Sequence, residues 1–124
     1  MKLKNLFVIT ALFFLINAVV ALLVPGTQLS LYGVTLGPGE KYMGQWAGLG
    51  SIAIGLLAWF ARNVADPDAK RAIILTLFIY FVIGVVISVL GTISGVMNAM
   101  GWSLVIIYLL FAAGYAYFLF RKPS

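Results

Sequence analysis

The charged residues of this chain lie in short clusters, and the stretches between the clusters have the length of membrane spans. Residues 5–24 and 42–61 carry no charged side chain over 20 residues each, and residues 72–120 carry none over 49. A helix of about 20 residues, rising about 1.5 Å per residue, crosses a hydrocarbon core of about 30 Å. The last stretch has room for two such helices joined by a turn. We therefore expect an all-α integral membrane protein whose single domain, residues 1–124, is a four-transmembrane-helix bundle with spans at about 6–24, 42–61, 72–94 and 102–120.

Composition supports a lipid environment. The chain is 64% hydrophobic and 9% charged, whereas a soluble domain carries about 25% charged residues. It contains no histidine and no cysteine, which excludes disulfides, thiolate nucleophiles and imidazole ligands. We expect no metal site and no cofactor.

The basic residues predict an orientation. If four spans alternate, seven basic residues fall on one side and Lys41, beside Glu40, falls on the other; the seven are Lys2, Lys4, Arg62, Lys70, Arg71, Arg121 and Lys122. This bias is the positive-inside pattern of a multi-pass protein of the cell membrane, with both termini cytoplasmic. At span ends these cations favour contact with anionic lipid, so the net charge of +5 does not indicate a nucleic-acid partner. The first apolar run is longer than the core of a signal peptide, and we interpret it as a first span.

Two predicted spans carry small residues on one helical face. Spacings of 4, 3 and 4 place four such residues on one side of a helix and include a GxxxG motif at 44–48. The second span has Gly44, Gly48, Ser51 and Gly55. The third has Gly84, Ser88, Gly91 and Gly95. We call these sets the small-residue stripes, assign them to helix packing, and expect the second and third spans to pack against each other through them. A partner helix from a second copy or from another membrane subunit is the alternative that the pattern leaves open.

A few uncharged polar residues lie where lipid alone would not favour them. Asn17, Gln45 and Tyr80 are the candidates for a small-molecule pocket. The simpler interpretation of Asn17 is a hydrogen bond to another helix. The outer loop, residues 25–41, is apolar and rich in glycine, and it is either an interfacial segment or a lid over the bundle.

Catalytic groups are scarce. The predicted spans contain no Asp, Glu, Lys, Arg or His well inside the membrane, and Glu40 has no acidic or imidazole neighbour with which to form an acid–base pair. Asp66 precedes Pro67, which is the pattern of a helix N-cap. In length and span number the chain resembles four-span multidrug exporters, but it lacks their acidic residue in the first span. Because the spans lack charged groups and Glu40 has no partner for acid–base chemistry, we expect that the protein is not an enzyme.

Several segments carry a family resemblance. They are Leu31-Tyr32-Gly33, residues 59–62 (WFAR), residues 71–75 (RAIIL), residues 95–102 (GVMNAMGW) and residues 111–120 (FAAGYAYFLF). With these segments the chain resembles a widespread, uncharacterised family of small bacterial membrane proteins with four spans, known as hypothetical proteins. The resemblance implies a four-helix bundle and carries over no activity and no site residues.

Two functions fit the sequence. The first is a small non-catalytic membrane protein, an accessory or structural subunit or scaffold that acts through helix packing with other subunits or with itself. The alternative is a passive transporter or binder of a small molecule or ion that works as an oligomer. The second function requires the uncharged polar residues to converge on one cavity.

Overall fold

The computed structural model describes residues 2–34 and 37–121, and this part of the chain is entirely helical outside its loops. Four helices are long and apolar enough to cross a membrane, which confirms the predicted number of candidate spans. A short helix, α2, lies in the loop after the first span. The bounds are α1 Leu3–Leu23, α2 Pro25–Leu31, α3 Pro38–Ala61, α4 Pro67–Ile93 and α5 Gly101–Phe120.

Local sequence explains where the helices begin. Helices α2, α3 and α4 each have proline in their first turn, where the missing amide hydrogen has no intrahelical partner to lose. Asp66 is the N-cap of α4, and its Oδ2 accepts a hydrogen bond from the amide of Ala69 at 3.1 Å, so the capping prediction is confirmed. The helix α4 ends before Gly95, whose φ of 85° suits a residue without a side chain.

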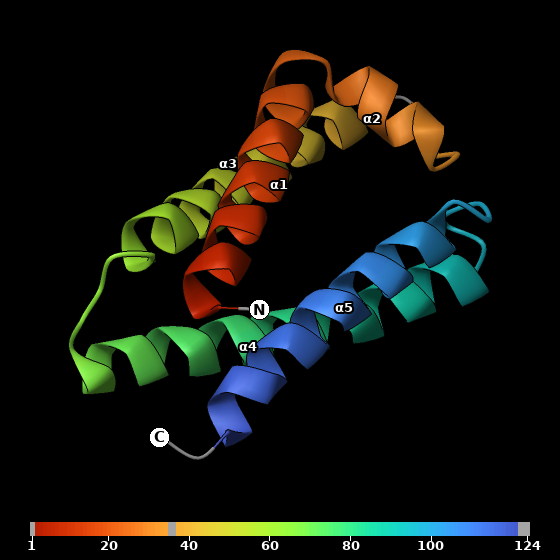
Figure 1. Ribbon diagram of the computed structural model, residues 1–124. Coiled ribbons are helices and arrows are strands. Elements are labelled where there is room, and N and C mark those ends of the chain that lie inside the picture. Colours follow the sequence, from red (N-terminus) through yellow and green to blue (C-terminus); the bar gives the residue numbers. More distant parts are fainter. Residues whose placement is uncertain (1, 35–36, 122–124) are drawn as a thin grey trace.

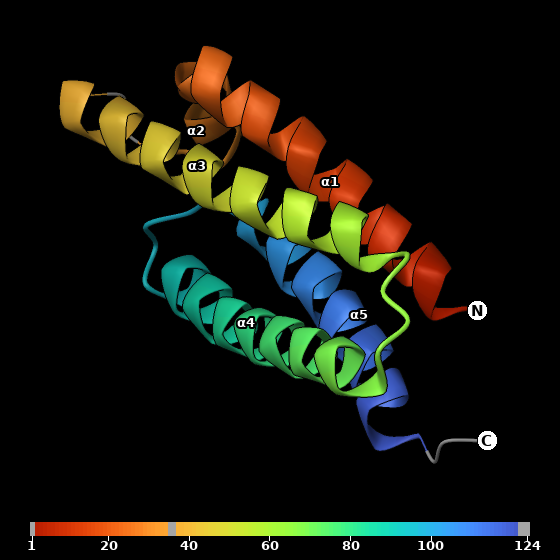
Figure 2. The same ribbon diagram turned by 90° about the vertical axis from the view of Figure 1, so that its left-hand side faces the viewer.

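The long helices form two hairpins. Helix α1 packs along α3, and α4 packs along α5, and most contacts between helices lie within these two pairs (Figures 1 and 2). Both termini and the connection from α3 to α4 lie at one end of the molecule, which we call the terminal end. Helix α2 and the connection from α4 to α5 lie at the other end, which we call the loop end.

The expected packing of α3 against α4 is not observed. Helix α3 contacts α1 and α2 instead, and α4 contacts α5. The small-residue stripes therefore lie inside separate hairpins. The physical reason is that each stripe accommodates large side chains of its hairpin partner, as described below.

An aromatic core joins the hairpins in the half of the molecule nearer the terminal end. Phe7 and Phe14 from α1 are fully buried with Phe81 from α4 and Tyr115 from α5. The rings of Phe81 and Tyr115 are nearly parallel, with centroids 5.8 Å apart. The Thr10 hydroxyl, also fully buried, lies 2.6 Å from the Tyr115 hydroxyl, so the one polar group of this tyrosine has a hydrogen-bond partner across the helices.

Candidate functional site: a cavity between the two hairpins

Between the hairpins, the half of the molecule nearer the loop end contains a partly open cavity. Its volume is about 590 Å³, and all five helices contribute to its walls. Pockets that hold small molecules commonly have volumes of about 300–1,000 Å³. Its apolar walls include Leu29, Ile54 and Leu104, and its polar side chains are Asn17, Gln28, Tyr32, Ser51, Tyr80 and Tyr108.

Three of the polar side chains form a hydrogen-bonded chain. The Gln28 Nε2 donates to Asn17 Oδ1 at 2.5 Å, and Asn17 Nδ2 donates to Ser51 Oγ at 3.2 Å. These residues belong to α2, α1 and α3, so the two hydrogen bonds join three helices at one wall of the cavity. The expected interhelical hydrogen bond of Asn17 is confirmed.

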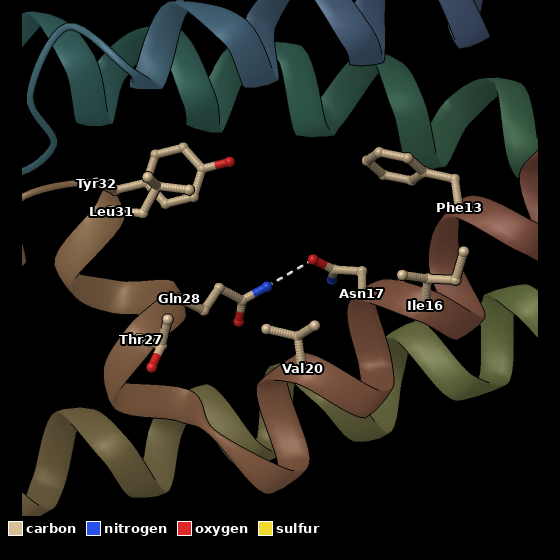
Figure 3. A pocket seen from close by; sticks show the side chains of 8 residues that line it. All are labelled: Phe13, Ile16, Asn17, Val20, Thr27, Gln28, Leu31 and Tyr32. Atoms are coloured by element: carbon tan, nitrogen blue, oxygen red, sulfur yellow. Dashed lines mark hydrogen bonds between the residues drawn. The ribbon is translucent and has the colours of Figure 1, made fainter.

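A second hollow adjoins this wall. It has a volume of about 330 Å³ and shares Asn17, Gln28 and Tyr32 with the cavity. Figure 3 shows Tyr32 at the end of α2 and Phe13 on α1 to either side of the hydrogen-bonded Asn17 and Gln28. The amide pair therefore lines both spaces.

The opposite wall is aromatic. The rings of Tyr80 and Tyr108, from α4 and α5, have centroids 6.3 Å apart. These two tyrosines line the cavity and also a smaller hollow of about 280 Å³ between α4 and α5. Phe14, from the core, lies 6.0 Å from Tyr80 and 6.1 Å from Tyr108 between ring centroids, so the tyrosine wall continues into the core.

The loop end of the cavity is covered by α2, which is held by the loop between α4 and α5. The backbone amide of Asn98 donates to the carbonyl of Tyr32 at 2.8 Å. The side-chain amide of Asn98 donates to the carbonyl of Leu31 at 3.3 Å. These bonds join the two hairpins at the loop end. Residues 25–34 thus fold over the bundle, and residues 35–36 of the same loop lie outside the described part.

Two of the three predicted pocket residues meet in this cavity. Asn17 and Tyr80 line it from opposite hairpins. Gln45 does not line it, because its side chain is exposed beside α1 and its Nε2 donates to the carbonyl of Leu22 at 3.4 Å. Sequence reasoning missed Gln28 and Tyr108, although an amide in an apolar loop was an available signal for Gln28.

The stripe on α3 faces α1 and α2. A Cβ added at Gly55 would lie 2.7 Å from Cγ of Leu15 and 3.2 Å from the backbone nitrogen of the same residue. Gly48 faces Ala21 and Leu22 in the same way, and Gly44 faces Pro25 and Leu29. Ser51 is buried on this stripe and also reaches the cavity.

The stripe on α4 faces α5 and the loop before it. A Cβ at Gly84 would overlap the ring of Tyr108, and one at Gly91 would lie 3.0 Å from Cε of Met97. The hydroxyl of Ser88 donates to the carbonyl of Gly84 at 2.7 Å. Gly95 lies beyond the end of α4, with no other atom within 4 Å of an added Cβ, so it does not extend the stripe.

The chemistry of the cavity is that of a neutral binding site. None of the described residues that line it is charged. In the described ranges, no three His, Cys, Asp or Glu side chains gather as a metal site requires. The lining supplies amides, hydroxyls and aromatic faces, which can orient a ligand. It supplies no group that ionises readily near neutral pH for acid–base chemistry.

No protein-family model, curated protein or solved structure matches the chain. Function is therefore inferred from the chemistry of the cavity.

Proposed function

We propose that this protein is a multi-pass membrane protein that binds a small uncharged molecule in the cavity between its hairpins. The observation that carries the proposal is the convergence of one polar side chain from each helix on one apolar-walled space. These side chains are Asn17, Gln28, Ser51, Tyr80 and Tyr108, from α1 to α5 in that order.

The proposed ligand has a hydrogen-bonding group and an apolar or aromatic body. A charged ligand would leave water for a space without a counter-charge. Burial of even a neutral polar group without a partner costs about 2–7 kcal/mol, and burial of an unpaired charge costs more. The amide chain of Asn17 and Gln28 can exchange hydrogen bonds with a carbonyl or hydroxyl group. The tyrosine wall suits a flat ring, since offset and edge-to-face aromatic contacts add about 0.5–1.5 kcal/mol each.

The membrane placement is part of the proposal. Four candidate spans support a multi-pass arrangement, and the terminal end carries Lys2, Lys4, Arg62, Lys70 and Arg71. We place this end in the cytoplasm by the positive-inside rule. The cavity then lies in the outer half of the bilayer, where α2 covers it from the outside.

An accessory or scaffold role through helix packing remains a second, separate prediction. Apart from Gly95, the glycines of both small-residue stripes face α1, α2, α5 and the loop at Met97 within the chain. A partner subunit or second copy would therefore have to bind another face. The outward sides of the long helices expose many large apolar side chains, which lipid or a partner can cover.

The test is a variant that fills the cavity without disturbing the helix. Gly50 lines the cavity, and an added Cβ there meets no atom within 4 Å. We expect Gly50→Leu to fold, because leucine is a better helix former than glycine by about 0.8 kcal/mol, and to occupy the space of the ligand. Gly39→Leu is the matched control, since Gly39 is also open but lies in the first turn of α3, outside the cavity.

The measurement compares the neutral small molecules that copurify with each protein in mild detergent, identified by mass spectrometry of solvent extracts. We expect a compound at near-stoichiometric amount with the unmodified chain and with Gly39→Leu, and at least about tenfold less with Gly50→Leu, which corresponds to a loss of about 1.4 kcal/mol. Equal retention by all three proteins, or no compound above the detergent blank, would refute the proposal.

A further inference from the structure

Another concave site lies at the terminal end, away from the cavity between the hairpins. It is a hollow of about 560 Å³ formed where α1 and α4 begin and α5 ends. Four basic side chains line it, together with the carboxylate of Asp68; the basic residues are Lys2, Lys70, Arg71 and Arg121. We call this site the basic hollow.

The basic residues of the hollow come from three different helix ends. The Arg71 guanidinium is positioned by a hydrogen bond from its Nη1 to the carbonyl of Leu119 at 3.3 Å. The Arg121 guanidinium lies 5.8 Å from the ring centroid of Phe118. Each contact leaves other guanidinium N–H groups to bind an anion, since arginine carries five donors.

Backbone dipoles favour an anion at the same place. Helices α1 and α4 both start at the hollow, at Leu3 and Pro67, and the first turn of a helix carries partial positive charge. The C-terminus of α5 opposes this field, and one of its carbonyls, that of Leu119, accepts the Arg71 hydrogen bond. Asp68 reduces the positive potential but is outnumbered by the four cations.

Apolar side chains also line the hollow. They are Leu3, Ile74, Phe118 and Leu119, and we call this set the apolar floor. A free phosphate ion would gain nothing from such a floor, whereas the glycerol and upper acyl carbons of a phospholipid would remove apolar surface from water. The juxtaposition of cations and apolar surface at a span end therefore favours a lipid over a soluble anion.

We propose that the basic hollow binds the headgroup of an anionic phospholipid, with the phosphate held by Lys2, Lys70 and Arg71 and the chains lying against the apolar floor. This site is independent of the ligand proposed for the cavity. It also differs from general attraction between a basic surface and an anionic leaflet, because it is concave and specific to particular residues.

The experiment uses native mass spectrometry of the full chain in mild detergent with an equimolar mixture of dioleoyl phosphatidylglycerol and dioleoyl phosphatidylcholine. The test variant is Lys2→Gln/Lys70→Gln. The control is Lys4→Gln/Arg62→Gln, which removes two positive charges at the same end from residues outside the hollow. Helical content by circular dichroism is compared for all three proteins.

We expect one phosphatidylglycerol to be retained in preference to phosphatidylcholine. Each basic residue at an anionic lipid surface contributes about a fivefold gain in affinity, so the test variant should bind phosphatidylglycerol about 25-fold more weakly. The control should stay within about twofold of the unmodified protein, because its charges lie outside the hollow.

Three outcomes would overturn the proposal. Equal weakening in the control would mean that only overall charge matters. Equal retention of the two lipids would remove the role of the headgroup charge. Displacement of the lipid by excess inorganic phosphate, but not by excess sodium chloride of matched ionic strength, would assign the site to a soluble phosphate.

Discussion

The close approach of α3 to α1 can be tested by comparing two glycines on the same helix. Gly55 lies in the contact with α1, and Gly50 lies five residues earlier on the open face of α3. We change each to alanine. Both substitutions bring the same methyl group and the same gain in helix propensity, about 0.5–1 kcal/mol. The difference in stability between the two variants therefore measures the packing contact alone.

The structure gives the size of that difference. At Gly55 the new methyl carbon would lie 2.7 Å and 2.9 Å from the Cγ and Cδ2 atoms of Leu15. The leucine side chain can rotate away, but the backbone nitrogen of Leu15, at 3.2 Å, can move only with α1. Overpacking of this kind costs about 1–3 kcal/mol. We expect Gly55→Ala to be less stable than Gly50→Ala by that amount.

The assay is reversible unfolding in mixed micelles of a mild detergent and sodium dodecyl sulfate, followed by circular dichroism and tryptophan fluorescence. The free energy of unfolding is extrapolated for each variant with a common slope. If Gly55→Ala is as stable as Gly50→Ala, then α1 and α3 are not in contact at Gly55 and the hairpin assignment is wrong. A change of slope would instead show that the unfolded state has changed.

Three further predictions use the same protein. Thr10→Val removes the hydrogen-bond partner of the buried Tyr115 hydroxyl, and it should lower the free energy of unfolding in mixed micelles by about 1–2 kcal/mol, with no further loss when Tyr115→Phe is added. Asn98→Ala removes a hydrogen bond to the end of α2, and it should speed amide hydrogen exchange in residues 25–31 while leaving global stability nearly unchanged; unaltered exchange would contradict the role of this bond. Asp66→Ala removes the N-cap of α4, and it should destabilise the protein by about 1 kcal/mol, whereas Asp66→Asn should retain most of the stability.

The four long helices could be predicted because their signal is local. Each span is bounded by charges, by the proline–glycine turn at 25–26 or by the glycine-flanked segment 95–101, and each has the length needed to cross a bilayer. The helix α4 begins at Pro67, where the capping pattern predicts a helix start, and the predicted apolar span at 72–94 lies within it apart from its last residue. A capped helix can extend past its apolar run. The Asp66–Pro67 signal marked the true start.

Helix pairing could not be predicted from the stripes because matching patterns do not identify partners. Two stripes of small residues suggested contact with each other, yet a groove of glycines also accommodates a large side chain. Gly55 faces Leu15, and Gly84 faces the ring of Tyr108. How closely two helices approach therefore depends on which large side chain lies opposite the glycines. The sequence of one helix does not identify that side chain.

The cavity illustrates the same limit for polar residues. An isolated amide such as Asn17 reads as a contact between helices, and its bond to Ser51 fits that interpretation. The sequence of one helix does not show that Gln28 also bonds to Asn17, or that Tyr80 faces the same space from the other hairpin. The hairpins meet through the core around Phe81 and have few contacts elsewhere, so polar groups of both hairpins in the loop-end half face a shared space. Whether a buried polar residue serves packing or binding is thus decided by where the aromatic core ends, which is a property of the assembled helices.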